Sequence, residues 1–189
     1  MTRRLRLWSA LFALVCVVVS AVALEVTDEP LEFDKVHGVI GQPVDVNGVL
    51  VTVLDVTAGQ TLADYSGDPL VRTPGLFVAV DLQITCPGPK DNPAGRVRLH
   101  AGERTYQEWQ GYAGVGAKAG YQSVSRLLFE IDPADLGSLV LETNKVEIIS
   151  GYQAHAWIDL QLAGAADRMR AEAADRAVQQ KSSSEEPIS

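Results

Sequence analysis

Residues 43–54 read PVDVNGVLVTVL, and this stretch decides the fold class. Asn47 and Gly48 stand between two runs rich in β-branched residues, and an Asn-Gly pair accepts the positive φ angles of a type I′ hairpin turn. In the second run Val49, Val51 and Val53 share one face, since side chains alternate along a strand. The stretch therefore predicts a β-hairpin with one buried face.

The clearest single strand covers residues 76–85 (LFVAVDLQIT). Its alternation predicts a core face made of Val78, Val80, Leu82 and Ile84. Prolines at positions 87 and 89 end the pairing, because proline has no backbone N–H to donate. Residues 57–75, which carry several glycines and prolines, are expected to form a long connection.

Further short strands are expected along the rest of the chain, with one helical turn at residues 132–135. They cover residues 97–100, 104–106, 123–131, 139–141, 145–149 and 154–160. Turn signals recur every ~8–12 residues, which is the spacing of an all-β sandwich, and no strand–helix alternation is seen. We therefore expect an antiparallel β-sandwich over residues 43–162.

Both flanks of this domain differ from it in composition. Residues 25–42 form an acidic linker in this interpretation, and residues 163–189 an alanine-rich tail. A Glu172–Arg176 pair favours helix in the tail, but few large apolar side chains are available to anchor it. We expect an exposed helix up to residue 180 and disorder beyond it.

The N-terminal part, residues 1–24, predicts a membrane anchor. The stretch from Leu7 to Leu24 holds 18 residues without a charge, near the lower limit for a transmembrane helix. Three arginines precede it and acidic residues follow it, so the positive-inside rule places everything after Leu24 outside the cell membrane. The alternative is a signal peptide cleaved after Ala23, which would leave the same domain secreted.

Charge narrows the choice of partners. The chain has a net charge of −8, and residues 25–162 alone carry −10. An acidic surface repels the phosphate backbone, so nucleic acid is not expected as a partner.

We expect no cofactor and no metal site. Cys86 is the single cysteine after the apolar segment, and it is either buried and inert or paired with another chain. The three histidines, His37, His100 and His155, lack the ligand spacing of a zinc site. Trp157, in the last expected strand, is predicted to be a core residue.

Four aromatic residues in a glycine-rich stretch are the best binding candidates: Tyr106, Trp109, Tyr112 and Tyr121. Tyrosine and tryptophan supply contact area at low entropic cost, and glycine supplies adaptability, as in antibody paratopes. The competing interpretation is that Tyr106 and Trp109 cover the open end of the sandwich core.

Residues 39–162 contain several short sequence signatures in a characteristic order. They are Gly41-Gln42-Pro43-Val44, the Asn47-Gly48 hairpin, the strand at 76–85, Val97-x-Leu99-x-x-Gly102-x-x-x-Tyr106 and Phe129-Glu130-Ile131. This order resembles the immunoglobulin-like domains of unknown function on secreted or membrane-anchored proteins of Gram-positive bacteria. The resemblance implies an immunoglobulin-like sandwich and an extracytoplasmic location, and it assigns no functional residue.

These patterns together predict a membrane-anchored, non-enzymatic interaction module or an accessory subunit of an envelope complex. Its expected partners are the membrane itself, through the apolar segment, and another envelope protein. A domain that binds a small ligand or an envelope polymer is the first alternative, and an unrecognised hydrolase is the second.

Overall fold

The computed structural model describes residues 34–89, 91–109, 115–145 and 154–188. It confirms the predicted hairpin, in which β2 (Val44–Val46) pairs antiparallel with β3 (Val49–Ala63). Asn47 and Gly48 have φ angles of 54° and 81°, as a type I′ turn requires. The three valines that were predicted to share the inner face of β3 are all buried.

The strand predicted at residues 76–85 is the centre of a longer strand, β4 (Pro69–Cys86). It pairs with β3 on one side and with β8 (Tyr121–Ile131) on the other. All four residues of its predicted core face are buried. Cys86, the last residue of β4, is buried as well, and pairing stops before the two prolines.

The prediction of a long connection at residues 57–75 is wrong. β3 continues to Ala63 and β4 starts at Pro69, so only a short turn separates them. Within this turn Asp64 Oδ1 accepts hydrogen bonds from the backbone N–H groups of Ser66 (2.8 Å) and Asp68 (2.9 Å). Pro69 is tolerated as the first residue of β4, because a residue at that position need not donate a backbone hydrogen bond to the neighbouring strand.

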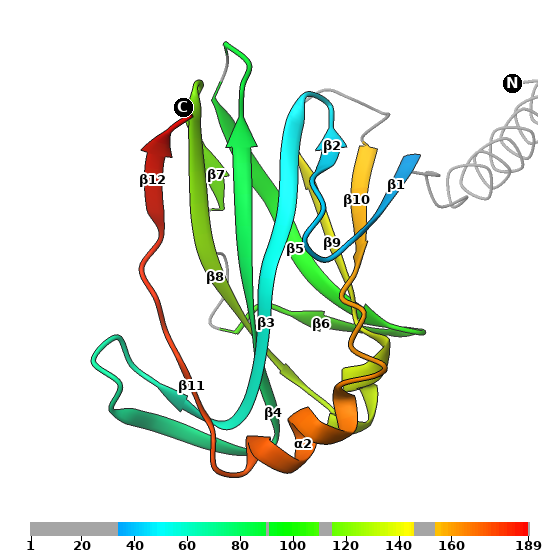
Figure 1. The fold of residues 1–189 in the computed structure, drawn as a ribbon, viewed down its shortest axis with the longest axis vertical. Coiled ribbons are helices and arrows are strands. Elements are labelled where there is room, and N and C mark those ends of the chain that lie inside the picture. Colours follow the sequence, from blue (N-terminus) through cyan, green and yellow to red (C-terminus); the bar gives the residue numbers. More distant parts are fainter. Residues whose placement is uncertain (1–33, 90, 110–114, 146–153, 189) are drawn as a thin grey trace, which may run out of the picture. The chain divides into compact units, whose positions relative to one another are not determined.

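The helix expected in the tail is confirmed over a shorter range, but its expected exposure is wrong. The helix α2 (Ala166–Ala173) lies at one end of the strands and packs on the core through Ala166, Met169 and Ala173 (Figure 1). Small alanine side chains bring the helix backbone close to the core, so a single large apolar side chain is enough to anchor it.

The end of the expected helix and the residues expected to be disordered beyond it each form a strand. β11 (Ala177–Gln179) pairs in parallel with β3, and β12 (Ser184–Pro187) pairs antiparallel with β8. Gly59 of β3 makes room for the start of this segment, because a Cβ there would lie 2.3 Å from the Arg176 carbonyl oxygen. The glycine that suggested a loop is therefore needed for a close backbone approach within the sheet.

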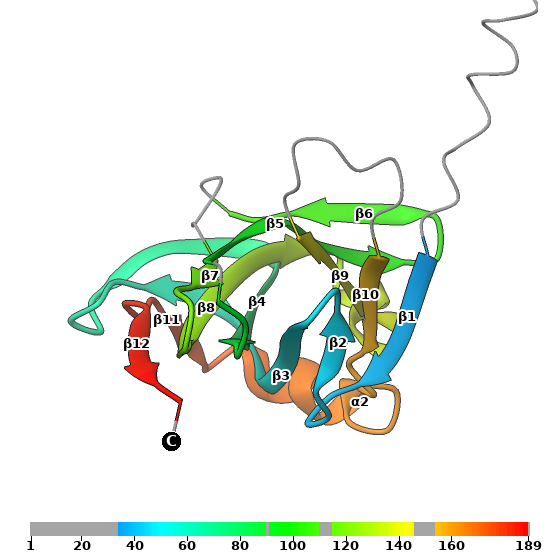
Figure 2. The same ribbon diagram turned by 90° about the horizontal axis from the view of Figure 1, so that it is seen from above.

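The strands form two sheets that face each other across the core (Figures 1 and 2). The second sheet has the order β11-β3-β4-β8-β12, with β2 beside β3. The strands of the first sheet are β1 (Asp34–Val39), β5 (Asn92–Ala101), β6 (Arg104–Gln107), β9 (Val140–Lys145) and β10 (Ala154–Asp159), and β7 (Gly116–Ala117) pairs with β5. Their order is β1-β10-β9-β5-β6. The described residues thus form the expected β-sandwich.

The first sheet departs from prediction in two places. β1 lies in the stretch expected to be a linker, and it pairs in parallel with β10, so the sandwich is not purely antiparallel. β9 runs through Thr143 and Asn144, where a break between two strands was predicted, and residues 146–149 lie outside the described residues. The helical turn predicted at 132–135 is confirmed as the 3-10 helix η1 (Pro133–Ser138).

The segment from Leu7 to Leu24 lies outside the described residues, as does Tyr112. Among the residues that are described, no helix has the length and apolar character needed to cross a bilayer.

Candidate functional site

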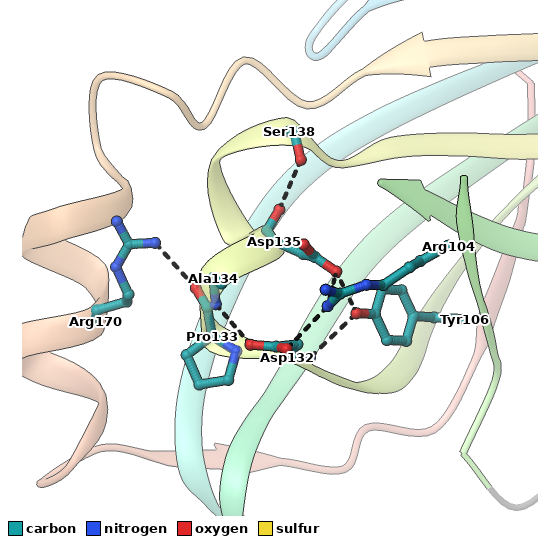
Figure 3. Close-up of polar contacts among 8 residues, drawn as sticks. All are labelled: Arg104, Tyr106, Asp132, Pro133, Ala134, Asp135, Ser138 and Arg170. Atoms are coloured by element: carbon teal, nitrogen blue, oxygen red, sulfur yellow. Dashed lines mark hydrogen bonds and ion pairs between the residues drawn. The ribbon is translucent and has the colours of Figure 1, made fainter. Parts of the chain in front are cut away.

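Tyr106 belongs to a polar clamp that ties β6 to η1 (Figure 3). Its hydroxyl donates to Asp135 Oδ2 (2.5 Å) and accepts from the backbone N–H of Asp132 (3.3 Å). Arg104 places one guanidinium nitrogen 2.8 Å from Asp132 Oδ2 and 3.0 Å from Asp135 Oδ2. The contacts give Tyr106 a structural role at this end of the sandwich, where its ring also packs against the core.

The surroundings of the clamp shift the pKa values of Tyr106 and Asp132. Burial and the hydrogen bond to Asp135 raise the pKa of Tyr106, so its hydroxyl keeps the proton that it donates. The backbone N–H of Ala134 and the guanidinium of Arg104 lower the pKa of Asp132. The neutral phenol of Tyr106 and the ionised carboxylate of Asp132 are thus stable together.

Trp109 lies on the outer face of the second sheet. Its ring meets Phe77 edge-on, with 5.1 Å between ring centroids, and its backbone N–H donates to the Leu128 carbonyl (2.6 Å). There it covers a small apolar cluster that is separate from the main core. This cluster consists of Leu62, Phe77, Ala79, Leu128 and Val178.

The structure does not gather the predicted aromatic residues into one patch. Tyr121 is the first residue of β8, whereas η1, which holds Tyr106, follows the last residue of that strand. The Lys118 ammonium lies 6.0 Å from the centroid of the Tyr121 ring. Tyr112 is outside the described residues, so a binding role for it stays a prediction.

A different cluster is built on the outer face of the first sheet, around Glu142 of β9. Glu142 Oε1 lies 2.7 Å from His155 Nδ1, and Glu142 Oε2 lies 2.6 Å from His100 Nε2. Glu142 and His155 are buried, at 8% and 6% residue exposure. One buried carboxylate thus joins imidazoles from two other strands, β5 and β10.

The register of the first sheet explains why these side chains from β5, β9 and β10 lie together. Trp157 of β10 opposes Glu142 of β9, which in turn opposes Arg98 of β5. On each strand the neighbours of these residues point into the core, so alternation turns Trp157, Glu142 and Arg98 outward together. We call this surface the histidine face and define it as Lys35, His37, Arg98, His100, Glu142, His155 and Trp157.

Trp157 is the aromatic centre of the histidine face. The prediction that it is a core residue is wrong, since it stacks on His100 with 4.7 Å between ring centroids and 25° between ring planes. The Lys35 ammonium lies 4.1 Å from the centroid of the indole ring. Contacts from β1 and β5 therefore hold this side chain in one orientation.

The histidine face keeps Glu142 ionised. Burial raises the pKa of Glu142, but hydrogen bonds from His155 and His100 outweigh it, and the net pKa lies below the ordinary value of 4.5. Because an ionised carboxylate can only accept, each imidazole presents an N–H to it. The other ring nitrogen of His100, Nδ1, lies 3.2 Å from Thr105 Oγ1.

Metal binding is not indicated in this part of the molecule. Within the described residues, no group of three or more histidine, cysteine, aspartate or glutamate side chains is arranged to hold a metal ion. At Glu142 both carboxylate oxygens already accept hydrogen bonds from imidazole rings.

Sequence reasoning missed the histidine face, although one signal was present. Ala156 and Ile158 point into the core, and alternation alone then places His155 and Trp157 on the opposite face. No local pattern indicates that Glu142 lies beside His155 and Trp157. Their proximity depends on the pairing of β9 with β10, and no short turn signal in the sequence predicts that pairing.

Comparison with known proteins gives no match: no family model, no curated protein and no solved structure corresponds to this chain.

Proposed function

We propose that the protein is a non-enzymatic interaction module, an immunoglobulin-like β-sandwich held outside the cell membrane by the segment from Leu7 to Leu24. Its partner in this proposal is another envelope protein. The arginines before the apolar segment and the acidic residues after it support the orientation. The two facing sheets support the immunoglobulin-like assignment.

The observation that carries the proposal is the fixed Trp157 at the centre of the histidine face. Tryptophan and arginine dominate the binding energy of many protein interfaces, and here Trp157 and Arg98 flank Glu142. A surface binds more tightly when its anchoring side chains are already ordered, because less entropy is lost on binding. The contacts of Trp157 with Lys35 and His100 supply that order.

Charge indicates the kind of partner surface that fits. The histidine face has two positively charged residues, Lys35 and Arg98, and one negatively charged residue, Glu142. It is therefore positive, although residues 25–162 as a whole carry a net charge of −10. A positive spot on an acidic molecule steers an acidic patch of the partner toward that spot and away from the rest of the surface. We therefore propose an acidic patch on the partner protein.

Affinity capture of the full chain from detergent-solubilised membranes tests this proposal. The wild type is compared with Trp157→Ala and with Leu54→Ala, an exposed apolar residue of the second sheet. We expect at least one co-purified protein to fall about ten-fold with Trp157→Ala and to be retained with Leu54→Ala. Identical sets of captured proteins from all three chains would contradict the proposal.

One observation favours a hydrolase as the second candidate. Thr105 Oγ1, His100 and Glu142 form a hydroxyl–imidazole–carboxylate chain, with 3.2 Å and 2.6 Å between successive polar atoms. Catalytic triads use the same order of groups. This candidate ranks second because Thr105 is exposed on the edge strand β6, whereas acyl-transfer sites exclude water.

Hydrolysis of a small chromogenic acyl ester separates the two candidates. A hydrolase predicts turnover by the purified wild type that is lost in both Thr105→Ala and His100→Gln. Equal background rates for the wild type and both variants would exclude the hydrolase and leave the interaction module in place.

A further inference from the structure

The C-terminal segment crosses the second sheet from one edge to the other. β11 lies at the β3 edge and β12 at the β8 edge (Figure 1). Between these edges, Lys181 Nζ lies 3.8 Å from Asp81 Oδ2 of β4, and the Gln179 carbonyl accepts from an Arg126 nitrogen of β8 at 3.3 Å. The segment therefore passes over the outer face of the sheet.

The two strands of this segment are held in different ways. In β11, Val178 is 2% exposed and belongs to the apolar cluster under Trp109. In β12 every residue is exposed, and none of Ser184–Pro187 enters an apolar cluster. β11 is thus an anchored strand and β12 a surface strand.

Polar contacts hold β12 on the edge of β8. Glu185 is held twice by Lys118, through the ammonium (2.8 Å) and through the backbone N–H (2.9 Å). Further hydrogen bonds join Gln122 to Glu186 (2.6 Å), Ser125 to Ser183 (2.9 Å) and the N–H of Ile188 to the Gly120 carbonyl (3.0 Å). Beside them runs the backbone ladder from Ser184 opposite Val124 to Pro187 opposite Tyr121.

Such contacts release easily. An exposed hydrogen bond or ion pair exchanges with water at little net cost, so a strand held only by these groups opens far more often than the core. When β12 opens, β8 becomes an unpaired edge, which is a template for another strand. Residues 180–183, between the two strands, lie outside any helix or strand and can act as a hinge.

We propose that the β8 edge docks the C-terminal strand of a second copy of this chain, so that two copies exchange β12 reciprocally. The exchanged strand keeps every contact, because Glu185 of one copy meets Lys118 of the other in the same register. Reciprocal exchange uses the same surface twice and closes as a two-fold dimer. The exchange uses the second sheet and does not depend on the histidine face.

Opposite charge changes in two separate chains test the exchange. Lys118→Glu places like charges at this contact within its own chain, and so does Glu185→Lys. Mixed together, the two full-length variants restore both opposite-charge contacts only when their β12 strands are exchanged. Native mass spectrometry from detergent should then show about ten-fold more 1:1 dimer in the mixture than in either variant alone.

The double variant Lys118→Glu/Glu185→Lys is the matched control, because it restores the contact within one chain. It should show no more dimer than the wild type at the same concentration. A mixture of the single variants with no more dimer than its components would overturn the proposal. Equal dimer formation by one single variant alone would overturn it as well, since that dimer would not depend on the strand contact.

A covalent readout gives independent evidence in the same mixture. Val124→Cys is added to the Glu185→Lys chain and Ser184→Cys to the Lys118→Glu chain, because residues 124 and 184 are opposite each other in the ladder. Exchange predicts a disulfide-linked pair after mild oxidation. Absence of this pair while both variants keep their thermal unfolding midpoints would overturn the proposal.

Discussion

At the scale of single residues, Glu142 organises the histidine face. Its carboxylate accepts from His100 and His155 while being almost fully buried. We expect Glu142→Gln to lower the free energy of unfolding by about 2 kcal/mol, because the amide nitrogen cannot accept a hydrogen bond from an imidazole. Urea unfolding measures this, and Glu103→Gln, at an exposed turn, should change stability by less than about 0.5 kcal/mol.

The destabilisation caused by Glu142→Gln should depend on pH. A carboxyl group whose pKa is lowered by folding stabilises the native state above its unfolded pKa and loses this contribution as the pH falls through its folded pKa. The stability difference between the wild type and Glu142→Gln should therefore be complete above pH 4.5 and shrink below it. A difference that widened as the pH fell below 4.5 would show that the ionised carboxylate is not the stabilising form.

The residues of this site were only partly predictable. Alternation along β10 places His155 and Trp157 on one face, because a strand repeats every two residues. It does not say which strand lies next to β10. Glu142 and His100 come from β9 and β5, and their position depends on strand pairing over long stretches of sequence, which propensities do not encode.

At the scale of elements, the clamp around Tyr106 fixes η1 to β6. We expect Tyr106→Phe to lower the free energy of unfolding by about 1–2 kcal/mol, because the ring still packs while the hydroxyl contacts with Asp135 and Asp132 are lost. Thermal unfolding measures the loss. Tyr65→Phe, at a side chain that is 64% exposed, is the control and should leave the midpoint unchanged. Equal midpoints for Tyr106→Phe and the control would refute a stabilising clamp.

A substitution at Gly59 tests how closely the C-terminal segment packs on β3. Alanine at this position places a Cβ 2.3 Å from the Arg176 carbonyl oxygen, so we expect the segment to shift outward and proteases to remove the C-terminus faster. Mass spectrometry of timed digests measures this. Gly164→Ala is the control, because its Cβ meets nothing within 4 Å. The same digestion rate in both variants would argue against close seating.

Elements defined by local signals were predictable, and those defined by distant contacts were not. The Asn47-Gly48 hairpin, the centre of β4 and the turn at η1 follow from short-range rules. The tail was misjudged because its composition offers few large apolar groups. Its order comes from small alanines on the core, the space at Gly59 and two sheet edges that were open to pairing.

At the scale of the whole domain, the two sheets have different outer faces. The first sheet carries the histidine face, with Trp157 fixed between Lys35 and His100. The second sheet is crossed by the chain's own C-terminal segment. The central proposal follows from this asymmetry: a partner protein binds the first sheet, while exchange between copies uses the second.

Site-specific photo-crosslinking in intact cells tests whether a partner protein binds the outer face of the first sheet. A photoreactive amino acid replaces His37, which is exposed on the histidine face, or Leu54, which is exposed on the second sheet. We expect a discrete crosslinked protein from position 37 that is absent from position 54 and is lost when Trp157→Ala is added. The same adducts from both positions, or none from position 37, would contradict it.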